Sequence, residues 1–160
     1  MGDLKYPKPK KREKTKRVKN HKRLTLSKVQ EIFNRAIRNR DEKSVLSWQR
    51  DDLQASHFMA RGGSSALRYY PPNVHAMTSG EHSSYHYRDP LPYTEWMQEN
   101  VPELEWMKRA RKVSVTWNQS DLEKIVSCCT VGAWRELTMY VENRINAIIG
   151  RKEDGKEHSL

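Results

Sequence analysis

The chain has 160 residues, of which 36% are hydrophobic and 31% are charged, and its net charge is +10. This composition allows one small domain with polar extensions. It excludes a membrane-spanning protein, because no run of roughly 18 apolar residues occurs, and we expect no secretory signal because no apolar segment follows the start.

The positive charge is concentrated in residues 1–23, which hold eleven Lys and Arg residues against two acidic ones, whereas the rest of the chain is nearly balanced at +1. With few apolar side chains this segment cannot bury a core, so we expect a disordered tail. Such a tail favours salt-sensitive binding to a phosphate backbone, and the candidate contacts are Lys10, Lys11, Arg12, Lys16 and Arg17. A solubilising or targeting tail is the alternative. An anionic membrane is disfavoured, because no amphipathic apolar face accompanies the charge.

The first predicted element after the tail is a helix over residues 28–40. Ser27 and Gln30 have the spacing of a capping box, and apolar side chains recur at helical intervals as far as Ile37. Residues 41–52 are mostly polar, so we expect them to form a connection.

Residues 53–88 are expected to form a strand, a loop, a second strand and a helix. The first strand is predicted at 53–60, the second at 67–70 and the helix at 81–88, with Gly62 in the intervening loop. A unit of this size needs surrounding helices to bury its apolar side chains.

Those helices are predicted in the second half of the chain. Two short ones are expected at 94–100 and 102–111, and apolar spacing predicts one long helix over 122–149 that ends at Gly150. Ser120 and Glu123 have the spacing of a second capping box. The last ten residues are polar, so we expect a C-terminal tail at 151–160, and the fold class is therefore α+β with mostly helices.

Four of the six histidines lie within 30 residues, at His57, His75, His82 and His86. Histidine is suited to proton transfer at neutral pH and to binding a transition metal. His82 and His86 are four residues apart on a predicted helix, so both side chains face the same side and can reach one ion. Such a pair is also often just two polar surface residues, and a lone strand histidine is often structural.

The stretch from Leu53 to His86 resembles the NinG (Rap) recombination nucleases of lambda-like phages, which belong to the HNH or ββα-metal superfamily. The matched segments are Ser56-His57-Phe58, Leu67-Arg68-Tyr69 and Asn73-Val74-His75. A looser similarity extends over about residues 27–137. The resemblance implies a mostly helical domain at 24–150 that encloses a small ββα-metal (HNH) unit.

The resemblance also implies a role for each matched residue. His57 would be the general base that deprotonates the attacking water, and Asn73 would orient its imidazole. His82 and His86 would hold one divalent ion, Mg²⁺, Mn²⁺, Ni²⁺ or Zn²⁺, against the scissile phosphate.

Three further residues are candidates on the same basis. Arg61 and Arg68 would contact phosphate. The role of His75 is left open, and one option is that it supports a metal ligand without binding the metal itself. The implied function is a metal-dependent HNH-type DNA endonuclease of phage recombination or replication. It would hydrolyse phosphodiester bonds of duplex or branched DNA. The expected location is the cytoplasm, which is that of the host cell if a phage encodes the protein. RNA as the substrate and the oligomeric state stay open.

Two alternatives remain. One is a catalytically inactive nucleic-acid-binding protein derived from an HNH nuclease, and the other is a protein that binds a host protein. The NinG family has a zinc-binding knuckle with four cysteines, and the resemblance places these at Ser44, Ser47, Thr78 and Glu81 of this sequence. The loss of all four cysteines motivates the first alternative. We therefore expect no structural zinc, and we expect packing around Trp48 to hold this region together.

Overall fold

The computed structural model describes residues 23–157, with side chains described as far as Arg151. Almost all of the predicted tail lies outside the described residues. So do its candidate phosphate contacts, Lys10, Lys11, Arg12, Lys16 and Arg17.

Helix α1, Leu26–Asp41, confirms the first predicted helix but begins two residues earlier. Its N-cap is Thr25, whose side chain accepts a hydrogen bond from the backbone N–H of Lys28. The predicted Ser27–Gln30 capping box is therefore wrong, because the hydroxyl of Thr25 already occupies that role and Gln30 is buried.

The sheet has two antiparallel strands, β1 at Leu53–His57 and β2 at Val74–Thr78, with His57 opposite Val74. The predicted second strand at 67–70 is wrong. Those residues form a turn, and a 3₁₀ turn at Pro71–Asn73 leads into β2 instead. The first four residues of β2 are all buried, so the alternation that marks a half-exposed strand does not occur there.

Three short helices follow β2. They are α2 at Ser79–Tyr87, α3 at Leu91–Asn100 and α4 at Leu104–Ala110. Each coincides with a predicted helix to within a few residues. The predicted start of α4 at Pro102 is wrong, since that proline lies in the turn before the helix.

The predicted long helix over 122–149 is two helices, α5 at Gln119–Val131 and α6 at Trp134–Glu157. Gly132 ends α5 in the left-handed region, with φ +69°, and its N–H bonds the carbonyl of Cys128. Glycine adopts this conformation without steric cost, so the chain turns a corner there.

The predicted ends of this region also need correction. The capping box is formed by Asn118 and Asp121, not by Ser120 and Glu123. Gly150 does not end α6, which continues to Glu157. A glycine inside a helix costs only about 1 kcal/mol relative to alanine, so it does not force a stop.

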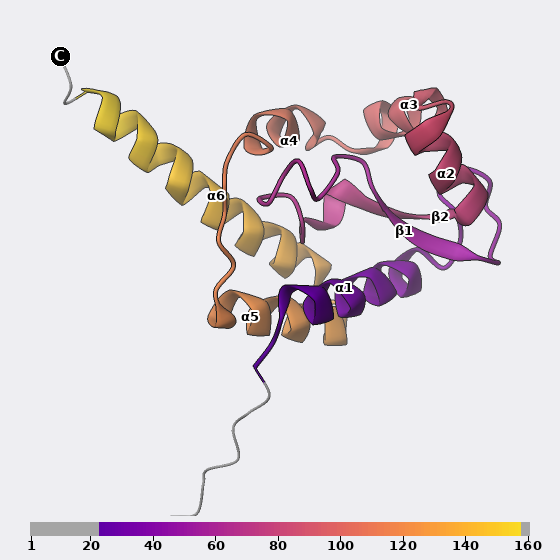
Figure 1. Ribbon diagram of the computed structural model, residues 1–160, viewed down its shortest axis with the longest axis horizontal. Coiled ribbons are helices and arrows are strands. Elements are labelled where there is room, and N and C mark those ends of the chain that lie inside the picture. The colour runs from indigo at the N-terminus through magenta and orange to yellow at the C-terminus, as the bar shows by residue number, and fades with distance from the viewer. Residues whose placement is uncertain (1–22, 158–160) are drawn as a thin grey trace, which may run out of the picture.

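The fold is α+β, as predicted. Figure 1 shows the two strands between α1 on one side and α2 and α3 on the other, and both α1 and α2 pack against both strands. The core lies between α1, the 67–70 turn, α5 and α6, where the ring of Tyr69 packs edge-on against Phe33 and Trp117. Among residues 23–157, no helix is long and apolar enough to span a bilayer.

Candidate active site

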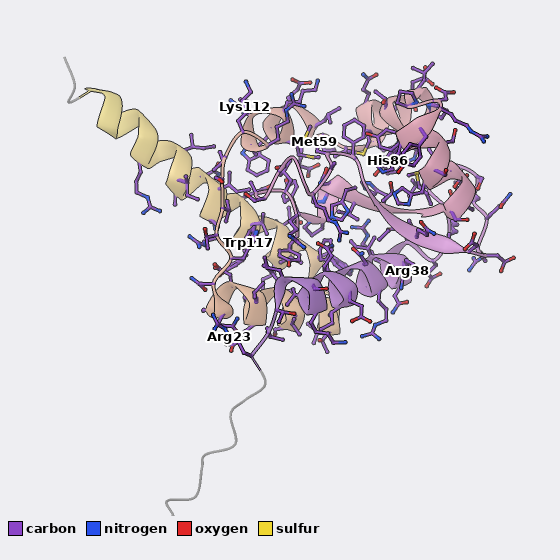
Figure 2. The ribbon with its side chains drawn as sticks, in the orientation of Figure 1. Arg23, Arg38, Met59, His86, Lys112 and Trp117 are labelled. Atoms are coloured by element: carbon purple, nitrogen blue, oxygen red, sulfur yellow. The ribbon has the colours of Figure 1, made fainter. Side chains whose placement is uncertain are left out.

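His57, His82 and His86 line one cavity of about 440 Å³. It lies beside β1, between α1 and α2, and Figure 2 shows two of its lining residues, Arg38 from α1 and His86 from α2. The other lining residues come from α1, β1 and the loop after β1: Asn34, Gln54, Ala55, Ala60, Arg61 and Gly62. The structure therefore brings together three histidines that are separated by up to 29 positions in the sequence.

His57 is the last residue of β1, and its side chain is buried with 8% exposure. Its Nε2 lies 3.0 Å from the backbone carbonyl oxygen of Arg68. Because a carbonyl oxygen only accepts, Nε2 carries the proton of the neutral ring and Nδ1 keeps a lone pair. Burial, with smaller contributions from the charges of Arg61 and Arg68, lowers the pKa of His57 to about 4. The ring is therefore neutral at pH 7 and can accept a proton at Nδ1.

His82 and His86 lie one turn apart on α2, with ring centroids 4.8 Å from each other. Oε1 of Gln54, on β1, lies 2.7 Å from Nδ1 of His82. This acceptor holds the His82 proton on Nδ1, so Nε2 is free to bind a metal, which is the arrangement usual for metal-binding histidines. Burial and the neighbouring His86 lower the pKa of His82, which also favours the neutral, ligating form.

The pair of imidazoles fits a divalent ion that takes its other ligands from water and phosphate oxygens. Within residues 23–157, no group of three or more His, Cys, Asp or Glu side chains is arranged to hold a metal. Among these residues, His82 and His86 are therefore the candidate ligands for an ion in this cavity.

Asn73 is fully buried, and its side chain bonds only backbone groups of the loop after β1. Its Oδ1 accepts from the N–H of Met59, and its Nδ2 donates to the carbonyls of Met59 and Leu67. The resemblance implies that Asn73 orients the imidazole of His57, but the hydrogen-bond partner of that ring is the Arg68 carbonyl. Asn73 therefore holds the loop at Met59, two residues after His57, and at Leu67, the residue before Arg68.

The two candidate phosphate-binding arginines differ in position, because Arg61 lines the cavity and Arg68 does not. Arg61 is exposed and lines it. Both Arg61 and Arg68 line an adjoining hollow of about 510 Å³ beside the start of α1. The Nε of Arg68 donates to Oε1 of Gln30 at 3.0 Å, which ties this arginine to α1.

His75 does not line the cavity. It is buried beside α3, where its Nδ1 lies 2.9 Å from the hydroxyl of Tyr93 and its ring packs edge-on against Trp96. Burial, with a smaller effect from Arg40, lowers its pKa to about 3. His75 is therefore a neutral packing residue between the sheet and α3, separate from the other three histidines.

Sequence reasoning missed the three lining residues with polar or charged side chains that come from α1 and β1, which are Asn34, Arg38 and Gln54. Arg38 had a signal, because the predicted first helix carries Arg35, Arg38 and Arg40 outside its apolar positions, which indicates a basic exposed side. Gln54 had none, since its contact with His82 joins residues 28 positions apart.

Four residues occupy the positions of the family's zinc-binding cysteines, and they form a hydrogen-bonded cluster: Ser44, Ser47, Thr78 and Glu81. Oγ of Ser44 donates to Oε2 of Glu81 at 2.6 Å, and the N–H of Thr78 donates to the same oxygen at 2.8 Å. Oγ of Ser44 also accepts from the N–H of Ser47. We name this set the Ser44–Glu81 cluster. Three of its side chains are hydroxyls, which do not fit a structural zinc site.

The cluster joins the 44–48 turn to the first turn of α2, where Thr78 and Glu81 also form a capping box. Burial alone would raise the pKa of Glu81, but the hydrogen bonds from Ser44, Ser47 and Thr78 outweigh burial and lower it. The expected packing by Trp48 is wrong, because this side chain is 68% exposed and φ of its residue is 66°. Nζ of Lys43 lies over its ring, 3.3 Å from the centroid.

Comparison with known proteins gives the site no relative of known function. No family model matches the chain, and neither the curated proteins nor the solved structures contain a match. The resemblance to the NinG nucleases therefore stays a prediction carried by the matched residues.

Proposed function

We propose that the protein is a metal-dependent endonuclease that hydrolyses phosphodiester bonds of DNA at the cavity beside β1. One observation carries this proposal. His57, His82 and His86 line one cavity, and their hydrogen bonds leave a free lone pair on Nδ1 of His57 and on Nε2 of His82. The ring at the end of β1 is then a base, and the pair on α2 is a site for a cation. Phosphodiester hydrolysis needs both.

In the proposed reaction, Nδ1 of His57 takes a proton from water as the water oxygen attacks phosphorus. The bond from phosphorus to the leaving oxygen breaks, and that oxygen is protonated from solvent. A divalent ion on His82 and His86 would stabilise the charge that develops on the phosphate and the leaving oxygen. Arg38 and Arg61 line the same cavity and attract the phosphate into it.

The bound phosphate itself helps His57 to act as a base. The charges of Arg61 and Arg68 both lower the pKa of this imidazole. A phosphate anion beside these arginines offsets their charge, so the His57 pKa rises when substrate binds. His57 is then a stronger base in the complex than in the free protein.

The finer expectations from the sequence belong to the same proposal. We infer that β1, β2 and α2 are the ββα-metal unit of an HNH-type nuclease and that residues 1–23 add affinity for DNA through phosphate contacts. The second candidate function is nucleic-acid binding without cleavage. It is favoured by the small ligand set, because catalytic zinc sites usually have three protein ligands and this cavity offers two.

The test is nicking of supercoiled plasmid and cleavage of branched DNA with Mg²⁺, Mn²⁺, Ni²⁺ or Zn²⁺. Wild type is compared with His57→Ala and His82→Ala, and His75→Gln serves as a control that alters an imidazole outside the cavity. Metal-dependent nicking that is lost in both alanine variants and kept in the control supports the proposal. Retained DNA binding without nicking by any metal would establish the second candidate.

A further inference from the structure

A second hollow lies on the other side of the loop that borders the active-site cavity. It has a volume of about 920 Å³, and we call it the basic-aromatic groove. Its lining residues are Phe58, Met59, Ala60, Gly63, Ser64, Tyr85, Lys108, Arg111 and Lys112. Ala60 lines both hollows, so they adjoin at this residue of the loop. In Figure 2, Lys112, Met59 and His86 follow one another across the molecule.

One side of the groove is aromatic. The rings of Phe58 and Tyr85 stack with centroids 6.0 Å apart and an interplanar angle of 21°. The hydroxyl of Tyr85 donates to the carbonyl of Phe58 at 2.7 Å, which fixes the pair in place. Both side chains are only partly buried although they are large and apolar.

The other side of the groove is cationic. Lys108, Arg111 and Lys112 are exposed and come from the end of α4 and the turn that follows it. Lys108 pairs with Glu105, and no acidic partner within the described part of the chain lies close enough to pair with Arg111 or Lys112. No acidic residue lines the groove.

An aromatic surface beside a row of cations matches the chemistry of a single nucleic-acid strand. The cations attract the phosphates, and aromatic side chains stack on bases that are not paired. In a duplex the bases are stacked on one another and leave no face for Phe58 or Tyr85. Because the two hollows adjoin at Ala60, a strand in the groove would lie near a phosphate in the active-site cavity.

We propose that the basic-aromatic groove binds an unpaired strand adjoining the scissile phosphate, so that the preferred substrate has a junction between duplex and single-stranded DNA. The location of the cleaved bond beside this strand rests on the proposed function. The groove inference goes beyond the proposed function, because it names the substrate class and the residues that select that substrate.

Binding is the primary test, because it needs no catalysis. The full chain with His57→Ala is titrated with a fluorescent blunt duplex and with the same duplex carrying a single-stranded flap. The groove variant is Lys108→Ser with Arg111→Ser and Lys112→Ser. Its control, Arg50→Ser with Arg109→Ser and Arg135→Ser, loses the same charge at exposed positions outside the groove.

We expect the protein to prefer the flapped DNA about tenfold or more, and the groove variant to lose this preference while the control keeps it. A 2-aminopurine in the flap should be quenched on binding, and Phe58→Leu should reduce the quenching. An unchanged preference in the groove variant overturns the proposal. An equal loss of affinity for blunt and flapped DNA also overturns it, because the groove would then contact duplex.

Cleavage separates this inference from the proposed function. If wild type binds flaps through the groove but cuts no DNA with any metal, the endonuclease proposal fails and the groove stands. If wild type cuts duplex and flapped DNA equally and the groove variant cuts both as well, the endonuclease proposal stands and the groove inference fails. A flap of RNA in place of DNA shows whether the groove also accepts ribose.

Discussion

Oε1 of Gln54 on β1 lies 2.7 Å from Nδ1 of His82 on α2, so one strand residue determines which ring nitrogen of a helix residue is free. Partners of this kind typically contribute a factor of about 10–100 in metal affinity. Gln54→Leu should therefore raise the Mn²⁺ concentration needed for half-maximal nicking about tenfold or more.

Gln54→Glu is the matched variant for this prediction, because it keeps an oxygen acceptor for the His82 proton. We expect it to retain metal activation, and isothermal titration with Mn²⁺ measures the affinity directly. Equal weakening in both variants would contradict the role of the acceptor.

The ring of His57 should titrate near pH 4 in the free protein, because burial disfavours its charged form. Nuclear magnetic resonance of the ring carbons measures this midpoint. Binding of a short DNA duplex should raise it, since the phosphate offsets the charges of Arg61 and Arg68. A free-protein midpoint near 6.5 would show that the ring is solvated, and a midpoint that does not move with DNA would show that no phosphate binds beside it.

His75 should make the fold sensitive to acid. Its pKa is about 3 in the folded protein, against an ordinary value of about 6.5, so the unfolded chain binds the extra proton first as the pH falls. The stability associated with the neutral ring is complete above about pH 6.5 and is lost progressively from there toward pH 3. In His75→Gln, the free energy of unfolding from urea denaturation should change less over this interval. An identical pH dependence in both proteins would contradict the prediction.

The Ser44–Glu81 hydrogen bond should stabilise the junction of the 44–48 turn with α2. Ser44→Ala leaves the Glu81 carboxylate without one donor, and we expect a loss of roughly 1–2 kcal/mol at pH 7. The Glu81 pKa is lowered in the folded state, so this stabilisation is present above the unfolded value of about 4.5 and disappears as the pH falls below it. The cost of Ser44→Ala should therefore shrink at pH 3.5.

Ser83→Ala is the control for that measurement, since Ser83 is exposed on the same helix. It should change the free energy of unfolding by less than about 0.5 kcal/mol at either pH. A Ser44→Ala cost that stays constant with pH would show that the bond does not depend on the carboxylate charge.

Asn73→Asp should destabilise the protein at least as much as Asn73→Ala, although aspartate has nearly the same shape. Nδ2 of Asn73 donates to two carbonyls, and a carboxylate oxygen in its place would face them with no proton to share. We expect a cost of roughly 2–4 kcal/mol for the aspartate variant by thermal or urea unfolding. Recovery of stability at low pH, where the aspartate becomes a donor, would support this explanation. A fully stable Asn73→Asp protein would contradict it.

Periodicity predicted the helices well where one face is apolar and the other polar, as in α1. It failed at Gly132, because apolar residues continue at helical spacing on both sides of the corner and hide the break. It also failed at β2, where burial of four consecutive residues removes the alternation that identifies a strand.

The histidine set was predictable from residue type and spacing, but its supporting contacts were not. His82 and His86 are neighbours on a helix, so a local pattern places them together. The partners Gln54 for His82 and Ser44 for Glu81 are distant in sequence. The pairing of β1 with β2 brings Gln54 close to His82, and a hydrogen bond from the N–H of Val45 to the carbonyl of Ala76 holds the turn of Ser44 beside β2. The carbonyl that holds His57 leaves no trace in the sequence, because every residue has one.

The use of a main-chain carbonyl determines which mutations of this loop preserve the position of the His57 ring. Since the acceptor for His57 is the main chain of Arg68, any amino acid at position 68 can supply it, and point mutation there alters charge without releasing the ring. An insertion or deletion between positions 58 and 68 would move the carbonyl and leave the base misdirected. Sequence drift in this loop is therefore constrained in its length more strictly than in its composition.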